Sequence, residues 1–266
     1  MKAPKTISAA HLLLVANDVG FTQKTNYAAE ARVACAMHGI PYRLVTFDGT
    51  CQTLSTIFRG SGVYRISTTN GEVLLNSFGY HIDEARKAGE IIIADMPSCI
   101  TDGDNPIMKA FAGSQIHTEF ESIGLLVPIT THNHSLKGAL EALAAFKAAG
   151  IKHDRGLVRA WRGEPSRPTW ESFPTFDSLK VHFPIWECST YMQSMEDMMQ
   201  GRGDYTEYPA LDKLAQKIVE DAQKMNTRER GHLRAAVTHL EKAKDAIYEH
   251  LLKPIVEKPA ISAVTA

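Results

Sequence analysis

Polar residues that could bind a phosphorylated ligand follow three apolar runs of the chain. Lys24-Thr25 comes after the run LLLVA and a polar turn, Asp48 after the run YRLVTF, and Asp95 after the run EIIIA. A lysine can bind phosphate oxygens, and a threonine hydroxyl or a carboxylate can hold Mg²⁺ or orient a water. The three clusters together point to a nucleotide and Mg²⁺.

The segment 11–30 has the order strand, polar turn, Lys-Thr, helix, which is the layout of a phosphate-binding loop. The pattern GxxxxGK[ST] requires glycine at positions 18 and 23, where this chain has Asp18 and Gln23. Glycine lets a backbone wrap around a phosphate at positive φ, a conformation that Gln23 does not adopt freely. The carboxylate of Asp18 would repel a β-phosphate unless it is paired or turned away. The candidate cofactor-binding residues are Gly20, Phe21, Thr22, Gln23, Lys24, Thr25 and Asn26.

Each candidate role has a plain structural alternative. We assign Lys24 and Asp48 to catalysis, and Thr25 and Asp95 to the metal, Asp95 acting through water. Alternatively, Lys24 is a solvated lysine and Thr25 a helix cap. Asp48 then begins an Asp-Gly turn, and Asp95 a turn before proline. Coincidence of the candidates at three strand ends favours the functional interpretation.

Alternating strands and helices predict an α/β fold, a mostly parallel sheet with helices on both faces. A ligand of such a sheet binds at the carboxyl ends of the strands. The expected strands are 11–16, 42–47, 90–94, 124–130, 155–161 and 179–184, with GVYRIS left open. The expected helices are 25–38, 81–88, 107–122 and 135–149, the last capped by Ser135, and residues 209–253 are expected to be mostly helical. We expect 163–178 to be a long loop.

Composition sets broad limits on function. The 266 residues are 44% hydrophobic and 22% charged, with a formal charge of −1, so no global charge favours nucleic acid or a membrane. The four cysteines form no CxxC pair, and the N-terminal apolar run is too short to cross a membrane. We expect a cytoplasmic protein with residues 1–208 as the nucleotide-binding domain and 209–266 as a C-terminal helical extension packed on it.

Other motifs carry less weight. His132 and His134 could ligate a metal if they lay on a strand, but solvated loop histidines are the preferred interpretation. No GxSxG, HExxH or EF-hand pattern occurs, and no GxGxxG follows the first strand. Basic residues at 228–244 are mixed with acidic ones, so a DNA-binding stripe there is a weak alternative to a solvated face.

The motifs in this order resemble the ParA/MinD group of P-loop ATPases over about residues 8–200. The matching segments are the Lys24-Thr25 loop, GIPYRLVTFDGTCQTLS, EIIIADMPS and GLLVPITTHNHSLKGALEALAAF. The resemblance is strongest to divergent StbB-type proteins, and it implies ATP and Mg²⁺ as cofactors. It also implies a role in plasmid partition, stability or conjugative transfer, with a homodimer and a plasmid-encoded partner protein.

The chain departs from that family at specific positions. The family's signature lysine, which reaches across the dimer to the partner's nucleotide, is matched here by Val19, and of the loop glycines only Gly20 remains. Lys24, Thr25, Asp48 and Asp95 are kept. The resemblance therefore implies nucleotide binding with weak ATPase activity, and the alternative is a pseudo-ATPase adaptor that binds a protein or DNA without hydrolysis.

Overall fold

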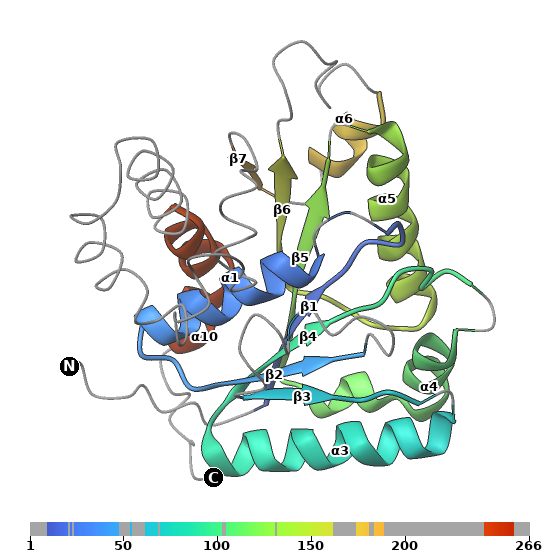
Figure 1. Ribbon diagram of the computed structural model, residues 1–266, viewed down its shortest axis with the longest axis vertical. Helices are drawn as coiled ribbons and strands as arrows, with labels where there is room; N and C mark the ends of the chain where they lie inside the picture. Colours follow the sequence, from blue (N-terminus) through green and yellow to red (C-terminus); the bar gives the residue numbers. More distant parts are fainter. Residues whose placement is uncertain are drawn as a thin grey trace, which may run out of the picture.

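In the computed structural model, seven strands of the described chain form one parallel sheet (Figure 1). The structure describes residues 10–20, 22, 24–47, 54, 62–68, 70–102, 105–130, 132–161, 174–180, 184–188 and 242–257. The strands are β1 His11–Val15, β2 Tyr42–Thr46, β3 Val63–Arg65, β4 Ile91–Asp95, β5 Ser122–Ile129, β6 Arg155–Trp161 and β7 Ile185–Cys188. Their order is β3-β2-β4-β1-β5-β6-β7, so the expected parallel α/β sheet is confirmed.

Helices cover both faces of this sheet (Figure 1). One face packs against α3 Gly71–Ala88, α4 Pro106–Ser114, the 3₁₀ turn η1 Ile116–Glu119 and α5 Asn133–Ala148, and α6 Pro174–Lys180 lies beside α5. The other face packs against α1 Lys24–Met37 and a C-terminal helix. That C-terminal helix comprises residues 242–247, the π-turn η4 Tyr248–Leu252 and α10 Lys253–Val256.

Each face has its own apolar core. Aromatic rings fill the α3–α4–α5 side, where Phe78 and Phe111 lie 5.6 Å apart between ring centroids, and Phe146 is buried. On the other side, α1 contributes small residues such as Ala28, which let it lie close to the sheet and to the C-terminal helix. Burial of α1 on both flanks explains why this helix has almost no exposed face.

The C-terminal helix is joined to the sheet by polar contacts as well. Arg155 of β6 donates from Nε to the carbonyl oxygen of Leu251 over 2.8 Å and from Nη2 to Ser122 Oγ over 3.1 Å. The rings of His38 and Tyr248 stack with centroids 3.8 Å apart. Pro254 lacks a backbone N–H, so a carbonyl in the preceding turn loses its helical donor where the π-turn occurs.

Pro128 sits inside β5, where a proline is usually excluded from a ladder. β1 ends at Val15, which pairs with Leu126, so Pro128 lies beyond the last β1 residue. The missing N–H therefore costs no bond to β1. The Pro128 carbonyl instead accepts a hydrogen bond from the side chain of Asn17 at 2.8 Å.

Two expectations about helix starts were wrong because capping residues were misassigned. α3 begins at Gly71 rather than at residue 81, since Asn70, although Asn-Gly is also typical of a turn, caps the helix by accepting from the N–H groups of Glu72 and Val73. α5 begins at Asn133, with Ser135 already inside it. The Ser135 hydroxyl accepts from Thr130 N–H at 2.9 Å and does not cap the helix.

Two further boundaries were misplaced. The helix expected at 107–122 ends at Ser114, because Gln115 adopts a left-handed conformation at φ 54°. Residues 174–180, expected to be loop and then strand, form α6, and the last strand begins at Ile185. The extent of the C-terminal extension from residue 209 stays a prediction, since 189–241 lie outside the described residues.

Candidate nucleotide-binding site

The sheet order places the connection from β1 to α1, residues 16–23, between two other segments. β1 lies between β4 and β5, with Val15 opposite both Asp95 and Leu126. The β1–α1 loop is therefore flanked by the turn after β4, residues 96–102, and by the start of α5. This is the position at which parallel α/β sheets bind ligands.

Asn17 fixes the start of the β1–α1 loop. Its side chain is fully buried and makes three hydrogen bonds, donating from Nδ2 to the carbonyls of Pro128 at 2.8 Å and Ser135 at 3.0 Å. Its Oδ1 accepts from the N–H of Val19 at 2.9 Å. The amide has two donors and an acceptor in use, so the loop is held to both β5 and α5.

Gly138 of α5 allows the loop to lie against that helix. The N–H of Asp18 donates to the carbonyl of Gly138 at 3.2 Å. A Cβ on Gly138 would lie 2.5 Å from Cγ2 of Val19 and 2.6 Å from Oδ1 of Asn17. Only glycine fits at this contact between helix and loop.

Asp18 turns toward the turn after β4. Its Oδ1 accepts from the N–H of Thr101 at 2.8 Å, and its carbonyl accepts from the N–H of Cys99 at 2.7 Å. Cys99 itself has a left-handed backbone, φ 58°. The carboxylate at the position of a missing glycine is thus paired with a backbone donor, which offsets the repulsion expected toward a phosphate.

Lys24 is the first residue of α1 and only 8% exposed, so the solvated-lysine alternative is wrong. Its Nζ donates to the carbonyl of Val19 at 2.8 Å and to Oγ of Ser98 at 3.0 Å. Thr22 Oγ1 donates to the same Val19 carbonyl at 3.2 Å. The ammonium group is therefore held between the Val19 carbonyl and the Ser98 hydroxyl, beside the positive end of the α1 dipole.

Thr25 meets Asp95 at the adjacent strand end. Thr25 Oγ1 donates to Oδ2 of Asp95 at 3.2 Å, and Thr46 Oγ1 donates to the same oxygen at 3.3 Å. Asp95 is 2% exposed. A hydroxyl and a carboxylate at this separation are the hard oxygen ligands that Mg²⁺ prefers, so the donor set fits this metal.

The predicted site residues divide into two groups. The structure brings together Gly20, Thr22, Lys24, Thr25 and Asp95, and places Asn26 in the buried first turn of α1. Phe21, Gln23 and Asp48 lie outside the described residues, so their roles stay predictions.

Sequence reasoning missed Ser98 and Thr46, which contact Lys24 and Asp95. Thr46 ends β2 and Ser98 follows β4, two strands that the sequence did predict. Strand neighbours in a sheet are not adjacent in sequence, however, so only the order of the strands could have paired them with the loop.

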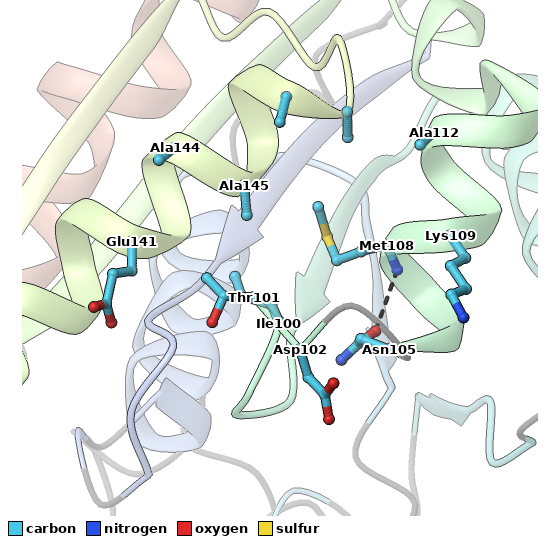
Figure 2. A pocket seen from close by; sticks show the side chains of 12 residues that line it. Ile100, Thr101, Asp102, Asn105, Met108, Lys109, Ala112, Glu141, Ala144 and Ala145 are labelled. Carbon is cyan, nitrogen blue, oxygen red and sulfur yellow. Dashed lines mark hydrogen bonds between the residues drawn. The ribbon is translucent and has the colours of Figure 1, made fainter.

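A groove lies beside this site, between α4 and α5 (Figure 2). It has a volume of about 530 Å³, and alanines of α5, including Ala144 and Ala145, form one wall. Met108 of α4 lies on the opposite side, and Ile100 and Thr101, from the turn held by Asp18, lie between the two helices (Figure 2). The turn after β4 thus contacts the β1–α1 loop through its backbone and this groove through its side chains.

Other candidate chemistry receives no support. His132 and His134 are exposed at the start of α5 and not on a strand. Among the described residues, no group of three His, Cys, Asp or Glu side chains could hold a metal ion. Across the same part of the chain, every helix is too short or too polar to span a membrane.

The parallel sheet and the helices that cover it have the fold of solved MinD structures. No protein-family model and no curated protein matches the chain. Among solved structures it is similar to the MinC:MinD cell division protein complex of Aquifex aeolicus, at 11% identity and a TM-score of 0.57, covering 91% of this chain and 96% of that one.

Two further solved structures share the architecture. The cell division ATPase MinD of Pyrococcus furiosus matches at 14% identity with a TM-score of 0.55, covering 90% of this chain and 98% of that one. The septum site-determining protein MinD of Pyrococcus horikoshii, complexed with Mg-ADP, matches at 14% identity with a TM-score of 0.56, covering 94% and 100%. At these identities the similarity shows a common fold.

Proposed function

We propose that this chain is a ParA/MinD-like protein that binds ATP with Mg²⁺ at the β1–α1 loop. The observation that carries the proposal is the convergence of Lys24 with the Thr25–Asp95 pair at the carboxyl ends of β1 and β4. Lys24 would hold phosphate oxygens, and Thr25 and Asp95 would hold Mg²⁺. The Pyrococcus horikoshii MinD with this fold is complexed with Mg-ADP, which supports the choice of ligand.

The proposed activity is that of a weak ATPase. Bound ATP would supply a phosphoryl group for in-line attack by water, and Asp48 would orient that water, with catalysis by positioning and charge. Val19 stands at the position of the family's signature lysine, so this chain would have less positive charge to stabilise the transition state.

Nucleotide binding would act as a switch for association. We propose a homodimer and a plasmid-encoded partner protein, in plasmid partition, stability or conjugative transfer. The Aquifex aeolicus structure is a complex of MinD with MinC, which supports a protein partner for this fold. The plasmid role follows from the resemblance of the sequence motifs alone.

Calorimetric titration with ATP, with and without Mg²⁺, tests the proposal. Wild type should bind more tightly with Mg²⁺, and Lys24→Ala should lose about tenfold or more in affinity, because a charge-assisted contact to phosphate is removed. Lys87→Ala, on the exposed side of α3, is the matched control and should bind as wild type does. Absence of binding by wild type would refute nucleotide binding.

The alternative is a pseudo-ATPase adaptor that keeps the fold and binds a protein or DNA partner without hydrolysis. Val19 favours it, since the cross-dimer lysine is absent and the Val19 carbonyl bonds Lys24 within the loop. Phosphate release over hours from Mg-ATP separates the two, because an adaptor releases none above the Lys24→Ala background. Gel shifts at several salt concentrations test DNA, whose binding would weaken steeply with salt.

A further inference from the structure

We propose that Ser98 is a further phosphate-binding residue, and that its hydroxyl shares a bound phosphate with Lys24. This inference rests on the proposed function. Ser98 lies in the turn after β4, outside the β1–α1 loop, and its Oγ is 3.0 Å from Nζ of Lys24. The ammonium donates in that contact, so the serine oxygen accepts and its own O–H remains a donor.

The first backbone N–H groups of the β1–α1 loop already donate within the protein. Phosphate-binding loops hold phosphate mainly through backbone N–H groups. Here the N–H of Asp18 donates to Gly138, and the N–H of Val19 donates to Oδ1 of Asn17. A side-chain hydroxyl beside the loop would add a donor that these two N–H groups do not supply.

Ser98 is placed to do this. A Cβ built on Gly20 would lie 3.6 Å from Oγ of Ser98, so the hydroxyl faces the loop at Gly20. A phosphate has several acceptor oxygens and can accept from an ammonium and a hydroxyl together. Lys24 would exchange the Val19 carbonyl for phosphate and keep its contact with Ser98.

The turn that carries Ser98 is held in position independently of any ligand. Asp18 accepts from the N–H of Cys99 and from that of Thr101, on the C-terminal side of Ser98. The hydroxyl is thus presented by a fixed turn, which reduces the entropy lost when it contacts a ligand. Substitution at Ser98 removes none of these backbone contacts.

The experiment measures binding of Mg-ATP, AMP and inorganic tripolyphosphate to wild type, Ser98→Ala and Ser98→Thr. Ser98→Ala should bind Mg-ATP and tripolyphosphate about tenfold more weakly, the cost of one hydrogen bond to a charged group, while AMP binding stays unchanged. Ser98→Thr, which keeps the hydroxyl, should bind close to wild type. Ser77→Ala on α3 is the matched control and should change nothing.

Melting temperatures without ligand separate binding from folding. Ser98→Ala loses the acceptor for Lys24 Nζ, so without ligand it should melt only about 2–4 °C below wild type, and its stabilisation by Mg-ATP should be smaller. If Ser98→Ala does not fold, Ser98→Cys, which keeps the size and weakens the donor, takes its place with the same expected loss.

Three outcomes would count against the inference. Equal affinity of wild type and Ser98→Ala for Mg-ATP overturns the role of Ser98 and leaves the proposed function standing. Equal weakening of ATP and AMP binding makes Ser98 a structural residue and overturns its phosphate contact. Failure of wild type to bind either tripolyphosphate or a nucleotide is the third such outcome, and it overturns the proposed function as well. Binding of tripolyphosphate without any nucleotide would overturn the proposed function and leave the role of Ser98 standing.

Discussion

Replacing Gly138 with alanine tests whether close contact between α5 and the β1–α1 loop holds the site together. The added Cβ must move from 2.5 Å to an ordinary 3.4 Å from Val19 Cγ2, a displacement of about 0.9 Å, and it must also leave Oδ1 of Asn17. Either shift weakens the bond between Asn17 and Val19 or that between Asp18 and Gly138. Overpacking of this kind costs about 3 kcal/mol at the upper end of its range.

Alanine also favours a helix over glycine by about 1 kcal/mol, so the net loss should be about 2 kcal/mol. For a chain of this size we expect a melting temperature lower by about 4–8 °C. Differential scanning calorimetry measures this shift, and calorimetric titration should show weaker Mg-ATP binding, since Val19 and Lys24 move with the loop.

The control is Gly79→Ala in the middle of α3, where an added Cβ meets nothing within 4 Å. It has the same gain in helix propensity without the clash, so it should raise the melting temperature by about 2–4 °C. If Gly138→Ala melted at or above the wild-type temperature, the contact between α5 and the loop would not be tight, and the reasoning would be wrong.

Three further predictions concern stability. Burial, followed by the charge of Arg43, lowers the pKa of His81 from 6.5, so as pH falls below about 6.5 the unfolded chain binds more protons and stability drops. The melting temperature should therefore fall less between about pH 7.5 and about pH 5.5 in His81→Gln than in wild type, and equal declines would contradict this. Arg155→Met keeps the buried stem but loses the donor to the Leu251 carbonyl, so urea unfolding should show a free energy of unfolding lower by about 2 kcal/mol. Amide exchange in the C-terminal helix should become faster, and unchanged exchange there would count against the contact. Asp18→Ala should lower the free energy of unfolding by about 1 kcal/mol, because it removes the acceptor for Thr101 N–H. Asp18→Asn keeps an acceptor and should melt near the wild-type temperature. An equal loss of stability in both variants would assign the effect to charge.

The parallel sheet and the strand that precedes Lys24 could be predicted because their signals are local. The run IIIAD has no polar residue until its end, which indicates a strand buried on both faces, and β4 has all five residues buried. The helix after Lys24 ends at Met37, and Gly39 follows it with φ 65°, as a left-handed helix end requires. Signals of this type depend on residues next to one another in the chain.

Asn70 and Ser98 show what such signals do not give. Asn-Gly is typical of a turn, but the same asparagine side chain can cap a helix. Which of the two forms depends on whether the apolar face of the segment after Asn70 packs on the sheet. Leu74 and Phe78 do pack there, so α3 begins ten residues earlier than expected. Ser98 carries no local signal at all, because its contact with Lys24 exists only once β4 lies beside β1.

The double anchoring of the β1–α1 loop has a consequence for the entropy of ligand binding. Asn17 fixes its first half to β5 and α5, and Asp18 fixes it to the turn after β4, all without a ligand. The conformational entropy of these residues is therefore lost during folding, and a ligand would meet them already ordered. The ammonium group of Lys24 would exchange the carbonyl of Val19 for phosphate, so the enthalpy of that exchange should contribute to the heat of binding.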